Sequence, residues 1–459
     1  MGRYQRAGTR QSGLPALSRT QLASLEEDRA EIPEELERPE PVREPKDLDH
    51  EFDENGKPIL FGATPFTQRE AFRYANGLLD AAAVKPGDVL GVEISAWIPE
   101  QVDAARALAL AAHARGCQFE VIVSESVSRE KVDRLLGRDA VFMQLSSFTP
   151  PGAEERPLTA EEEAFVEAHA APQHDADAWD AYMEAYQNNE VRWNMAVWPT
   201  RNWAKAVYPE LDPDEAYRKL GQDLRYLARC ADDDPEGAWR EHVEALQQRA
   251  DELNKFGAKK LRIKGAGTDL QIDVADGAKF AICQWETRQG SIASVNTPTE
   301  EVFTTPDPGS ATGVIKATKP FVFNPGNGEP TEVVEGVWVR LEKGRVVEIG
   351  SDSDDPYHQM LLEDLFSERL QTDRIGEIGL VGQDSRVAEL GRVFNNNFVD
   401  ENGGLHFGFG YSYDSITGGE GHRAASHYDI SCGSDQTEIW AVDASGNERK
   451  IMEGGRWLI

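Results

Sequence analysis

From residue 67 to 123 the apolar positions follow a helical period and a strand-like period in turn. Residues 67–83 are typical of an amphipathic helix, and after the turn V-K-P-G-D the run 89–94 is typical of a buried strand. A second helix is expected over 100–115 and a second strand over 119–123. This order predicts a right-handed crossover and a parallel sheet. No glycine-rich phosphate loop follows the first strand, so a Rossmann-like topology here need not bind a nucleotide.

Helices are predicted to dominate the next part of the chain. Loops flank acidic helices over 124–190, and 195–204 is expected to form a strand that leaves the sheet at Pro199. Over 212–255 the pattern predicts two helices, opened by D-P-D-E and D-P-E-G.

The pattern changes at Gly257, which predicts a second kind of architecture. Short β-like runs then alternate with glycine, asparagine and aspartate turns, and S-G-N at 445–447 indicates a hairpin. One helix is expected over about 357–370. The second half is therefore predicted to be mainly antiparallel sheet.

Three regions follow from these patterns. Residues 1–58 are rich in Glu, Pro and Arg and poor in large apolar side chains, which predicts an acidic, disordered extension. Residues 59–257 are expected to form a Rossmann-like α/β domain with a helical segment, and residues 258–459 a β-rich, mainly antiparallel domain. A chain of 459 residues is long enough to bury two cores.

The net charge narrows the choice of partners. The chain has 81 acidic and 48 basic residues, a formal charge of −33. Such a surface repels phosphate backbones and anionic lipids, so neither a nucleic acid nor a membrane is an expected partner. The charge is compatible with a solubility surface and with adaptation to high internal salt.

Cysteine usage and the chain terminus predict a cytoplasmic protein. The four cysteines lie far apart without a C-x-x-C pair, which excludes a thiolate zinc cage and a disulfide framework and fits a reducing compartment. The N-terminus has basic residues but no apolar run of a secretory signal. No segment approaches the roughly 18 apolar residues of a membrane span.

The last third of the chain contains most of the residues that a metal-hydrolase site needs. Two imidazoles, three carboxylates and a phenol are suitable ligands for one or two zinc, cobalt or manganese ions. These candidates are Glu301, Glu377, His406, Tyr413, His427 and Asp429.

Two pairs among them have an informative spacing. His427 and Asp429 are two apart on a predicted strand, so their side chains share a face, although a half-exposed strand is the commoner reason for such a pair. His406 and Tyr413 are seven apart and would face opposite ways on a regular strand. Because Gly408 lies between them, we expect a bulge to bring them to one side.

The alternatives for single residues are simpler. Phe407, Phe409 and Tyr411 alternate and are expected to face the core. Glu300 and Glu301 are adjacent, so only one can face inward on an extended segment. Four other histidines are not expected to be ligands: His50, His169 and His174 should be exposed, and His242 structural or exposed.

The joint pattern resembles peptidase family M29, the thermophilic-type metallo-aminopeptidases. The segments N-T-P-T-E-E-V-F-T-T-P, R-I-G-E, G-G-L-H-F-G-F-G-Y-S-Y and H-Y-D-I occur in the family's order. The resemblance covers about residue 84 to the C-terminus, weakly over 124–190. The chain departs from the family just before the last histidine, where it has His422, Arg423 and Ala424.

The resemblance implies an aminopeptidase that releases N-terminal residues from short peptides. It implies two divalent ions, Zn, Co or Mn, held by Glu301, Glu377, His406, His427 and Asp429, with Tyr413 at or beside them. Glu377 would bridge the ions, their shared water would be the nucleophile, and Tyr413 would stabilise the oxyanion. It also implies a homodimer with an enclosed site.

Two other functions are compatible with the same ligand set. A two-metal site alone does not determine which kind of bond is hydrolysed, so a hydrolase acting on another amide or ester is one alternative. The other is a catalytically silent metal-binding protein that keeps its ligands for stability.

Overall fold

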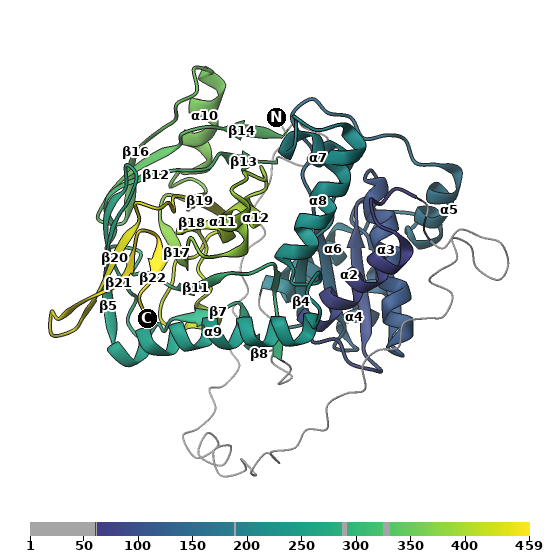
Figure 1. Cartoon of the computed structure of the whole chain (residues 1–459), viewed down its shortest axis with the longest axis horizontal. Coiled ribbons are helices and arrows are strands. Elements are labelled where there is room, and N and C mark those ends of the chain that lie inside the picture. The colour runs from purple at the N-terminus through teal and green to yellow at the C-terminus, as the bar shows by residue number, and fades with distance from the viewer. Residues whose placement is uncertain (1–59, 61, 188–189, 287–291, 325–330) are drawn as a thin grey trace, which may run out of the picture. The chain divides into compact units, whose positions relative to one another are not determined.

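The computed structural model describes residues 60, 62–187, 190–286, 292–324 and 331–459 (Figure 1). The predicted extension, 1–58, and His50 within it lie outside the described residues. The described residues belong to one compact unit, Glu44–Ile459.

The first half of the chain builds a parallel sheet, as predicted. Its strand order is β10-β4-β3-β1-β2, and every pairing in it is parallel. The strands are β1 (Val89–Ile94), β2 (Gln118–Val123), β3 (Val141–Ser146), β4 (Arg192–Val197) and β10 (Asn296–Thr297). The last of these comes from the second half of the chain and pairs with β4, so the two halves share this sheet.

Helices cover both faces of this sheet. They are α2 (Gln68–Ala81), α3 (Pro99–Ala114), α4 (Arg129–Leu136), α5 (Ala160–His169) and α6 (Ala176–Gln187). The connection β1–α3–β2 runs in one direction along the sheet and β2–α4–β3 runs back across β1, so right-handed crossovers place α3 and α4 on opposite faces. In agreement, α2 packs on α3, whereas α4 packs on α6.

Between β4 and the second half the chain is helical, with one boundary that the sequence prediction placed wrongly. The predicted strand at 195–204 is β4, which ends at Val197 before Pro199. Thr200 then caps the next helix by accepting a hydrogen bond from the Trp203 N–H, so helix replaces strand from Arg201. The helices here are α7 (Arg201–Val207), α8 (Pro213–Leu227) and α9 (Pro235–Phe256).

A five-stranded antiparallel sheet forms the centre of the second half. Its order is β19-β18-β17-β11-β7, and its strands are β7 (Ala281–Ile282), β11 (Glu301–Thr304), β17 (Ile375–Val381), β18 (His406–Gly410) and β19 (His427–Ser431). One face is buried in a hydrophobic core cluster through Val302, Ile378, Leu380, Phe407, Phe409 and Ile430. The opposite face therefore carries the alternate residues of the same strands.

An eight-stranded sheet of order β16-β15-β12-β6-β5-β20-β21-β22 closes this core. Its strands are β5 (Ala258–Lys264), β6 (Asp269–Asp273), β12 (Thr312–Lys316), β15 (Trp338–Glu342), β16 (Arg345–Gly350), β20 (Glu438–Asp443), β21 (Glu448–Glu453) and β22 (Arg456–Trp457). The predicted hairpin at 445–447 joins β20 to β21 and is confirmed. The predicted helix at 357–370 is α10 (Pro356–Leu365), which ends earlier than expected.

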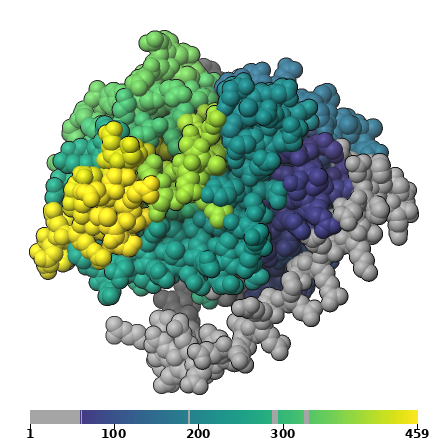
Figure 2. Space-filling model, viewed as in Figure 1, coloured from purple at the N-terminus to yellow at the C-terminus, as the bar shows by residue number. Residues whose placement is uncertain are grey.

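Short elements complete the second half. The paired strands are β8 (Gln284–Glu286) with β9 (Ile292–Ser294), and β13 (Phe321–Phe323) with β14 (Glu332–Val334). The short helices are α11 (Arg386–Leu390), α12 (Asn397–Asp400), η2 (Glu401–Gly403) and α13 (Asp414–Thr417). In Figure 2 the yellow-green surface around α11 lies against the teal surface of α8. Arg386, in α11, pairs at 2.8 Å with Asp232, which follows α8 in the chain.

The observed fold is therefore mixed α/β, with one parallel sheet and several antiparallel sheets. Within the described ranges, no helix combines the length and the hydrophobicity that a bilayer crossing requires.

Candidate metal centre

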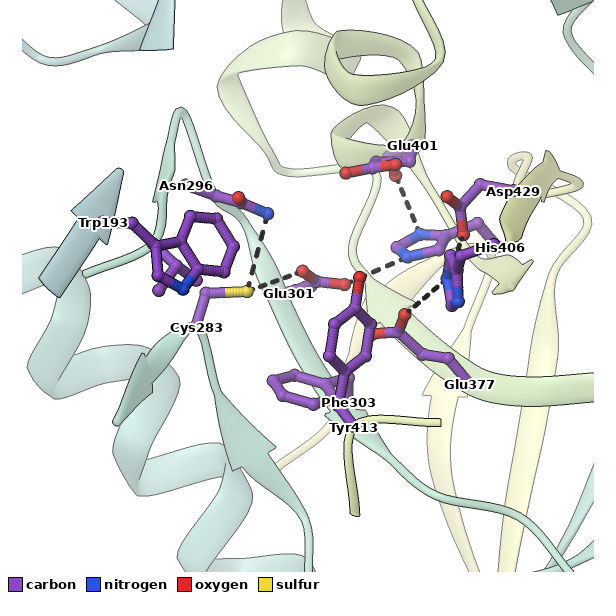
Figure 3. Close-up of a pocket in the computed structure, with 12 residues that line it drawn as sticks. Trp193, Cys283, Asn296, Glu301, Phe303, Glu377, Glu401, His406, Tyr413 and Asp429 are labelled. Carbon is purple, nitrogen blue, oxygen red and sulfur yellow. Dashed lines mark hydrogen bonds and ion pairs between the residues drawn. The ribbon is translucent and has the colours of Figure 1, made fainter. Parts of the chain in front are cut away.

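Five of the six predicted site residues lie on the five-stranded sheet, and the sixth, Tyr413, lies in the connection between β18 and β19. Glu301 begins β11, Glu377 lies in β17, His406 begins β18, and His427 and Asp429 lie in β19. All five side chains project from the face opposite the core, and Figure 3 shows the site side chains gathered around one region. With Tyr413 they line a cavity of about 50 Å³, roughly two water volumes.

His406 and Glu301 form one side of the cavity. His406 Nε2 lies 3.0 Å from Glu301 Oε2, and the thiol of Cys283 donates to Glu301 Oε1 at 2.7 Å. The other ring nitrogen, Nδ1, lies 3.1 Å from the backbone oxygen of Glu401. A carbonyl can only accept, so a neutral His406 carries its proton on Nδ1 and directs the lone pair of Nε2 into the cavity.

His427 repeats this arrangement on the other side. Its Nε2 lies 3.1 Å from Glu377 Oε2 and 3.2 Å from Asp429 Oδ1. Its Nδ1 lies 2.8 Å from the backbone oxygen of Tyr411, which again leaves Nε2 for the cavity.

Two glycines make room for the imidazole rings. Gly379 pairs with His406 across β17 and β18. A Cβ on Gly379 would lie 2.0 Å from His406 Nε2, and a Cβ on Gly408 would lie 2.1 Å from His427 Nε2. The positions of both rings therefore depend on neighbouring strands that carry no side chain at these points.

Tyr413 reaches the cavity by a route that the sequence prediction missed. The predicted bulge in β18 is wrong, because β18 keeps regular pairing with β19 as far as Gly410. Tyr413 lies beyond the strand, at the N-terminus of α13, where the chain turns back toward the cavity. The irregularity in this part of the sheet is in β17, between Ile375 and Glu377.

The aromatic residues next to it divide between the core and the site. Phe407 and Phe409 are buried in the core, as predicted. Tyr411 is not in that core; its ring lies 5.0 Å from the ring of His427, and its hydroxyl lies 3.4 Å from the hydroxyl of Tyr413. The strand ends at Gly410, so the alternation that predicted a core position for Tyr411 no longer applies.

The adjacent acids Glu300 and Glu301 are separated as the alternation requires. Glu300 points away from the cavity and forms an ion pair with Arg229 at 2.9 Å, with both side chains 6% exposed. His242 Nε2 lies 2.7 Å from the backbone oxygen of Thr299, so this histidine is structural. The charged pair thus anchors the start of β11 from behind.

Several residues of the cavity were not predicted. Glu401, in η2, and five residues of the opposite wall line it, namely Trp193, Cys283, Val295, Asn296 and Phe303. Figure 3 shows Trp193, Cys283 and Asn296 grouped on the side away from His406. Trp193 comes from the parallel sheet, a contact that no local pattern indicates. Glu401 could have been noted, because it lies five residues before His406.

The charges of the cluster are strongly coupled. Burial and the charge of Glu301 raise the pKa of Glu377 to about 7. Burial disfavours a charged imidazole, yet the close contact with Glu301 and its negative charge raise the pKa of His406 to about 10. For His427, too, burial is outweighed by Asp429, and its pKa is held well above the usual value. The cluster thus has excess negative charge that protons or cations must neutralise.

The donor set fits divalent cations. Glu301, Glu377 and His406 form one candidate ligand group, and Glu377, His427 and Asp429 form another, with ligand atoms within 4.8 Å of one another in each. Buried atoms in both groups, Glu301 Oε2, His427 Nε2 and Asp429 Oδ1, have close neighbours but no partner in hydrogen-bond geometry. Buried polar atoms without such partners are expected where a cation binds. Imidazole and carboxylate suit zinc, cobalt or manganese.

His169, His174 and His422, which the sequence analysis also named, lie outside this cluster. His174 is exposed and His169 is partly buried at the end of α5. The ring of His422 lies 2.7 Å from the backbone oxygen of Gln371 and does not line the cavity.

Replacing Gly408 with alanine is expected to impair the site without unfolding the protein. The new Cβ would overlap His427 Nε2 and lie 3.0 Å from Asp429 Oδ1, so the ring must move. A displacement of about 1 Å at a catalytic group costs roughly 100-fold in rate. Turnover and bound metal should both fall, whereas Gly265→Ala, whose Cβ would meet Thr437 at an ordinary 3.6 Å, should leave both unchanged. Equal activity of the two variants would contradict this role for Gly408.

The chain is similar to known metallopeptidases. The profile of the family described as thermophilic metalloprotease (M29) matches residues 125–457. Aminopeptidase T from Thermus aquaticus is 31% identical over 299 residues, 63% of this chain and 71% of that protein. Aminopeptidase AmpS from Bacillus subtilis (strain 168) is 29% identical over 296 residues, 61% of this chain and 69% of that protein. The solved structure of wild-type AmpT from Thermus thermophilus has a TM-score of 0.70 and 25% identity, covering 85% of this chain and 100% of that one.

Proposed function

This chain belongs to the thermophilic metalloprotease family (M29), and from this premise we propose that it is an aminopeptidase that releases N-terminal residues from short peptides with two divalent ions. The observation that carries the proposal is the pair of candidate ligand groups that share Glu377. The similar proteins named aminopeptidase support the choice of reaction.

The proposed ligands divide between the two ions. Glu301 and His406 would hold one ion, His427 and Asp429 would hold the other, and Glu377 belongs to both candidate groups. Such a pair of ions would supply a bound water of lowered pKa and polarisation of the scissile carbonyl. The four outer ligands come from three strands of one sheet, so the ion positions are fixed by strand register rather than by loops.

Two further side chains have roles in the proposed reaction. The phenol of Tyr413 is buried, and burial and the hydroxyl of Tyr411 raise its pKa well above the usual value, so it retains its proton at neutral pH. It donates that proton in a hydrogen bond to the oxygen that becomes negative in the tetrahedral intermediate. Glu401 lines the cavity without belonging to either ligand group. It is suited to carry a proton from the attacking water to the leaving amine.

The negative charge of the cavity also favours an exopeptidase. A free α-amine is a cation that the carboxylates can bind, whereas an internal peptide bond offers no such group. The two alternatives, a hydrolase for another amide or ester and a silent metal-binding protein, do not need this feature. N-terminal acetylation of the substrate therefore separates the proposal from both.

The test compares metal-stripped protein with protein refilled with Zn²⁺, Co²⁺ or Mn²⁺ on a panel of aminoacyl-p-nitroanilides and short peptides. We expect stripping to remove turnover by more than about 10³-fold, because the ions supply several kcal/mol of transition-state stabilisation. Refilling should restore release of N-terminal residues, and N-acetylated substrates should not react. Turnover of esters alone would favour the first alternative, and metal-dependent thermal stability without turnover would favour the second.

The domain division, the Rossmann-like character of the first sheet and the homodimer stay proposals. Light scattering after size-exclusion chromatography tests the dimer directly.

A further inference from the structure

A second cavity lies at the carboxyl end of the parallel sheet, outside the metal centre. Its volume is about 270 Å³, room for roughly nine waters. It is lined by Glu93, Ile94, Ser95, Gln101, Ser124, Gln144, Leu145, Ser146 and Met195. These residues come from the ends of β1, β2 and β3 and from β4 and α3, so the cavity is formed by elements that are rigid parts of the fold.

The cavity occupies a special position in the sheet topology. The chain leaves β1 toward β2 on one side and later returns to β3 on the other side of β1. The helices α3 and α4 that make these connections diverge at this point. In open parallel sheets the crevice at such a reversal of strand order, at the carboxyl ends, is where ligands bind.

Glu93 reaches into this cavity with a carboxylate that has only neutral partners. Its oxygens accept hydrogen bonds from Ser124 Oγ at 3.0 Å, Gln144 Nε2 at 2.9 Å and Tyr182 OH at 2.9 Å. No ion pair to Glu93 occurs among the residues that the structure describes. Glu93 lies deep in the protein yet remains partly accessible, because the cavity connects it to solvent. A carboxylate in such a place is costly unless a cation reaches it.

A second carboxylate and an exposed indole lie beside the cavity-lining Ser95. Glu125 accepts from Ser95 Oγ at 2.7 Å and from the Ala96 N–H at 3.0 Å, which again are neutral donors. Trp97, two residues after the cavity-lining Ser95, is 69% exposed. Carboxylates and an aromatic face are the groups that bind ammonium and guanidinium ions.

We propose that this cavity binds an organic cation of the lysine or arginine type, with Glu93 as the buried anchor. The apolar part of the wall, Ile94, Leu145 and Met195, contacts the aliphatic stem of such a ligand, and the carboxylates of Glu93 and Glu125 receive its charged head. The depth of Glu93 favours a ligand with a stem over a bare inorganic ion.

Residues of the same strand, β4, line both this cavity and the metal centre. Met195 lines this cavity and Trp193 lines the metal centre, and the two are two residues apart on β4, so their side chains share a face. Met195 and Trp193 are therefore about 7 Å apart along β4. A basic side chain of a bound peptide could supply the cation, a source that rests on the proposed function. A free amino acid or amine could supply the same chemistry.

The first experiment measures binding without catalysis. Nα-acetyl-arginine amide has a guanidinium but no free α-amine, and Nα-acetyl-citrulline amide is its neutral isostere. Calorimetry at low salt should give the arginine compound at least about tenfold tighter binding, the preference expected from one charge-assisted pair. Glu93→Gln should abolish the preference for the arginine compound, and Glu125→Gln, beside Ser95, should reduce it. Glu244→Gln, which changes an exposed carboxylate elsewhere, should leave the preference for the arginine compound unchanged.

Equal binding of both compounds by the unmodified protein would overturn the proposal, and circular dichroism checks that Glu93→Gln is folded. If Glu93→Gln does not fold, the Glu125→Gln result decides.

The second experiment distinguishes the two sources of the cation. Peptides with the same N-terminal alanine and a downstream arginine or citrulline are compared in the unmodified protein and in Glu93→Gln. A preference in kcat/KM for arginine that Glu93→Gln removes, with alanine p-nitroanilide turnover unchanged, identifies the peptide as the source. Tight binding of the arginine compound without that preference identifies a free cation. Binding with no peptide turnover in any protein would leave the cation site in place and remove only the aminopeptidase proposal.

Discussion

Replacement of Glu377 by glutamine is expected to abolish turnover and metal binding together. Glu377 is the residue common to both candidate ligand groups, and its side chain lies 3.1 Å from His427 Nε2. Glutamine keeps the shape but loses the charge, so it cannot neutralise two ions. We expect a loss in kcat/KM of more than about 10³-fold, which corresponds to roughly 4 kcal/mol of transition-state stabilisation. Bound metal, measured by mass spectrometry of the purified protein, should fall in parallel.

The control for this variant is Glu335→Gln, which changes an exposed carboxylate outside the centre. It should retain full metal content and full turnover. The melting temperature of metal-stripped Glu377→Gln should be no lower than that of the stripped unmodified protein, because the substitution removes a charge from a crowded acidic cluster. Retained turnover in Glu377→Gln would reject the assignment of the centre.

Replacement of Arg229 by methionine is expected to destabilise the protein by about 3–5 kcal/mol, the cost of leaving a buried charge without its partner. Arg229 is the ion-pair partner of Glu300, and both are almost fully buried. His242 Nε2 also lies near Glu300, at 3.8 Å, but burial, the largest influence on the pKa of His242, disfavours its charged form and limits its ability to replace Arg229. Arg229 has a positive φ of 60°, and methionine at this position adds no new backbone cost relative to arginine. The midpoint of urea unfolding reports the change.

An exposed ion pair provides the matched comparison. Arg369 pairs with Asp364, and both side chains are more than half exposed. Arg369→Met should therefore cost less than about 1 kcal/mol. Adding Glu300→Gln to Arg229→Met should recover part of the lost stability, since it removes the unpaired charge. A midpoint for Arg229→Met as high as that for Arg369→Met would show that the pair does not anchor β11.

The local pattern of the chain was enough to predict many of its elements. The short apolar runs at 89–94 and 119–123 and the helical spacing between them predict β1, α3 and β2, because each of these elements buries apolar residues that its own sequence specifies. The prediction was weakest over 124–190, where β3 and α4 were missed. There the apolar runs are short, and charged residues lie between them.

Each candidate ligand could be selected from the sequence, because it is an imidazole or a carboxylate on a segment predicted to be a strand. The two-residue spacing of His427 and Asp429 also predicts that their side chains share one face of the strand. The way in which they meet was decided by tertiary structure. The regular pairing of β18 with β19 and the bulge in β17 set the approach of Glu377 to His427, and Tyr413 enters from beyond the strand.

The sequence by itself determined which side chains are suited to bind a metal ion and where many of the strands lie, since side-chain type and the apolar pattern are local properties. Only the tertiary structure decided which residues line the cavity opposite these side chains. Trp193 and Asn296 are 103 residues apart, on β4 and β10, and they reach the cavity because these strands pair in parallel. Glu93, Ser124 and Gln144 likewise form a second cavity only because three strand ends meet at one edge of the sheet. Contacts of this kind depend on which strands become neighbours, and strand order is set by the packing of the whole chain.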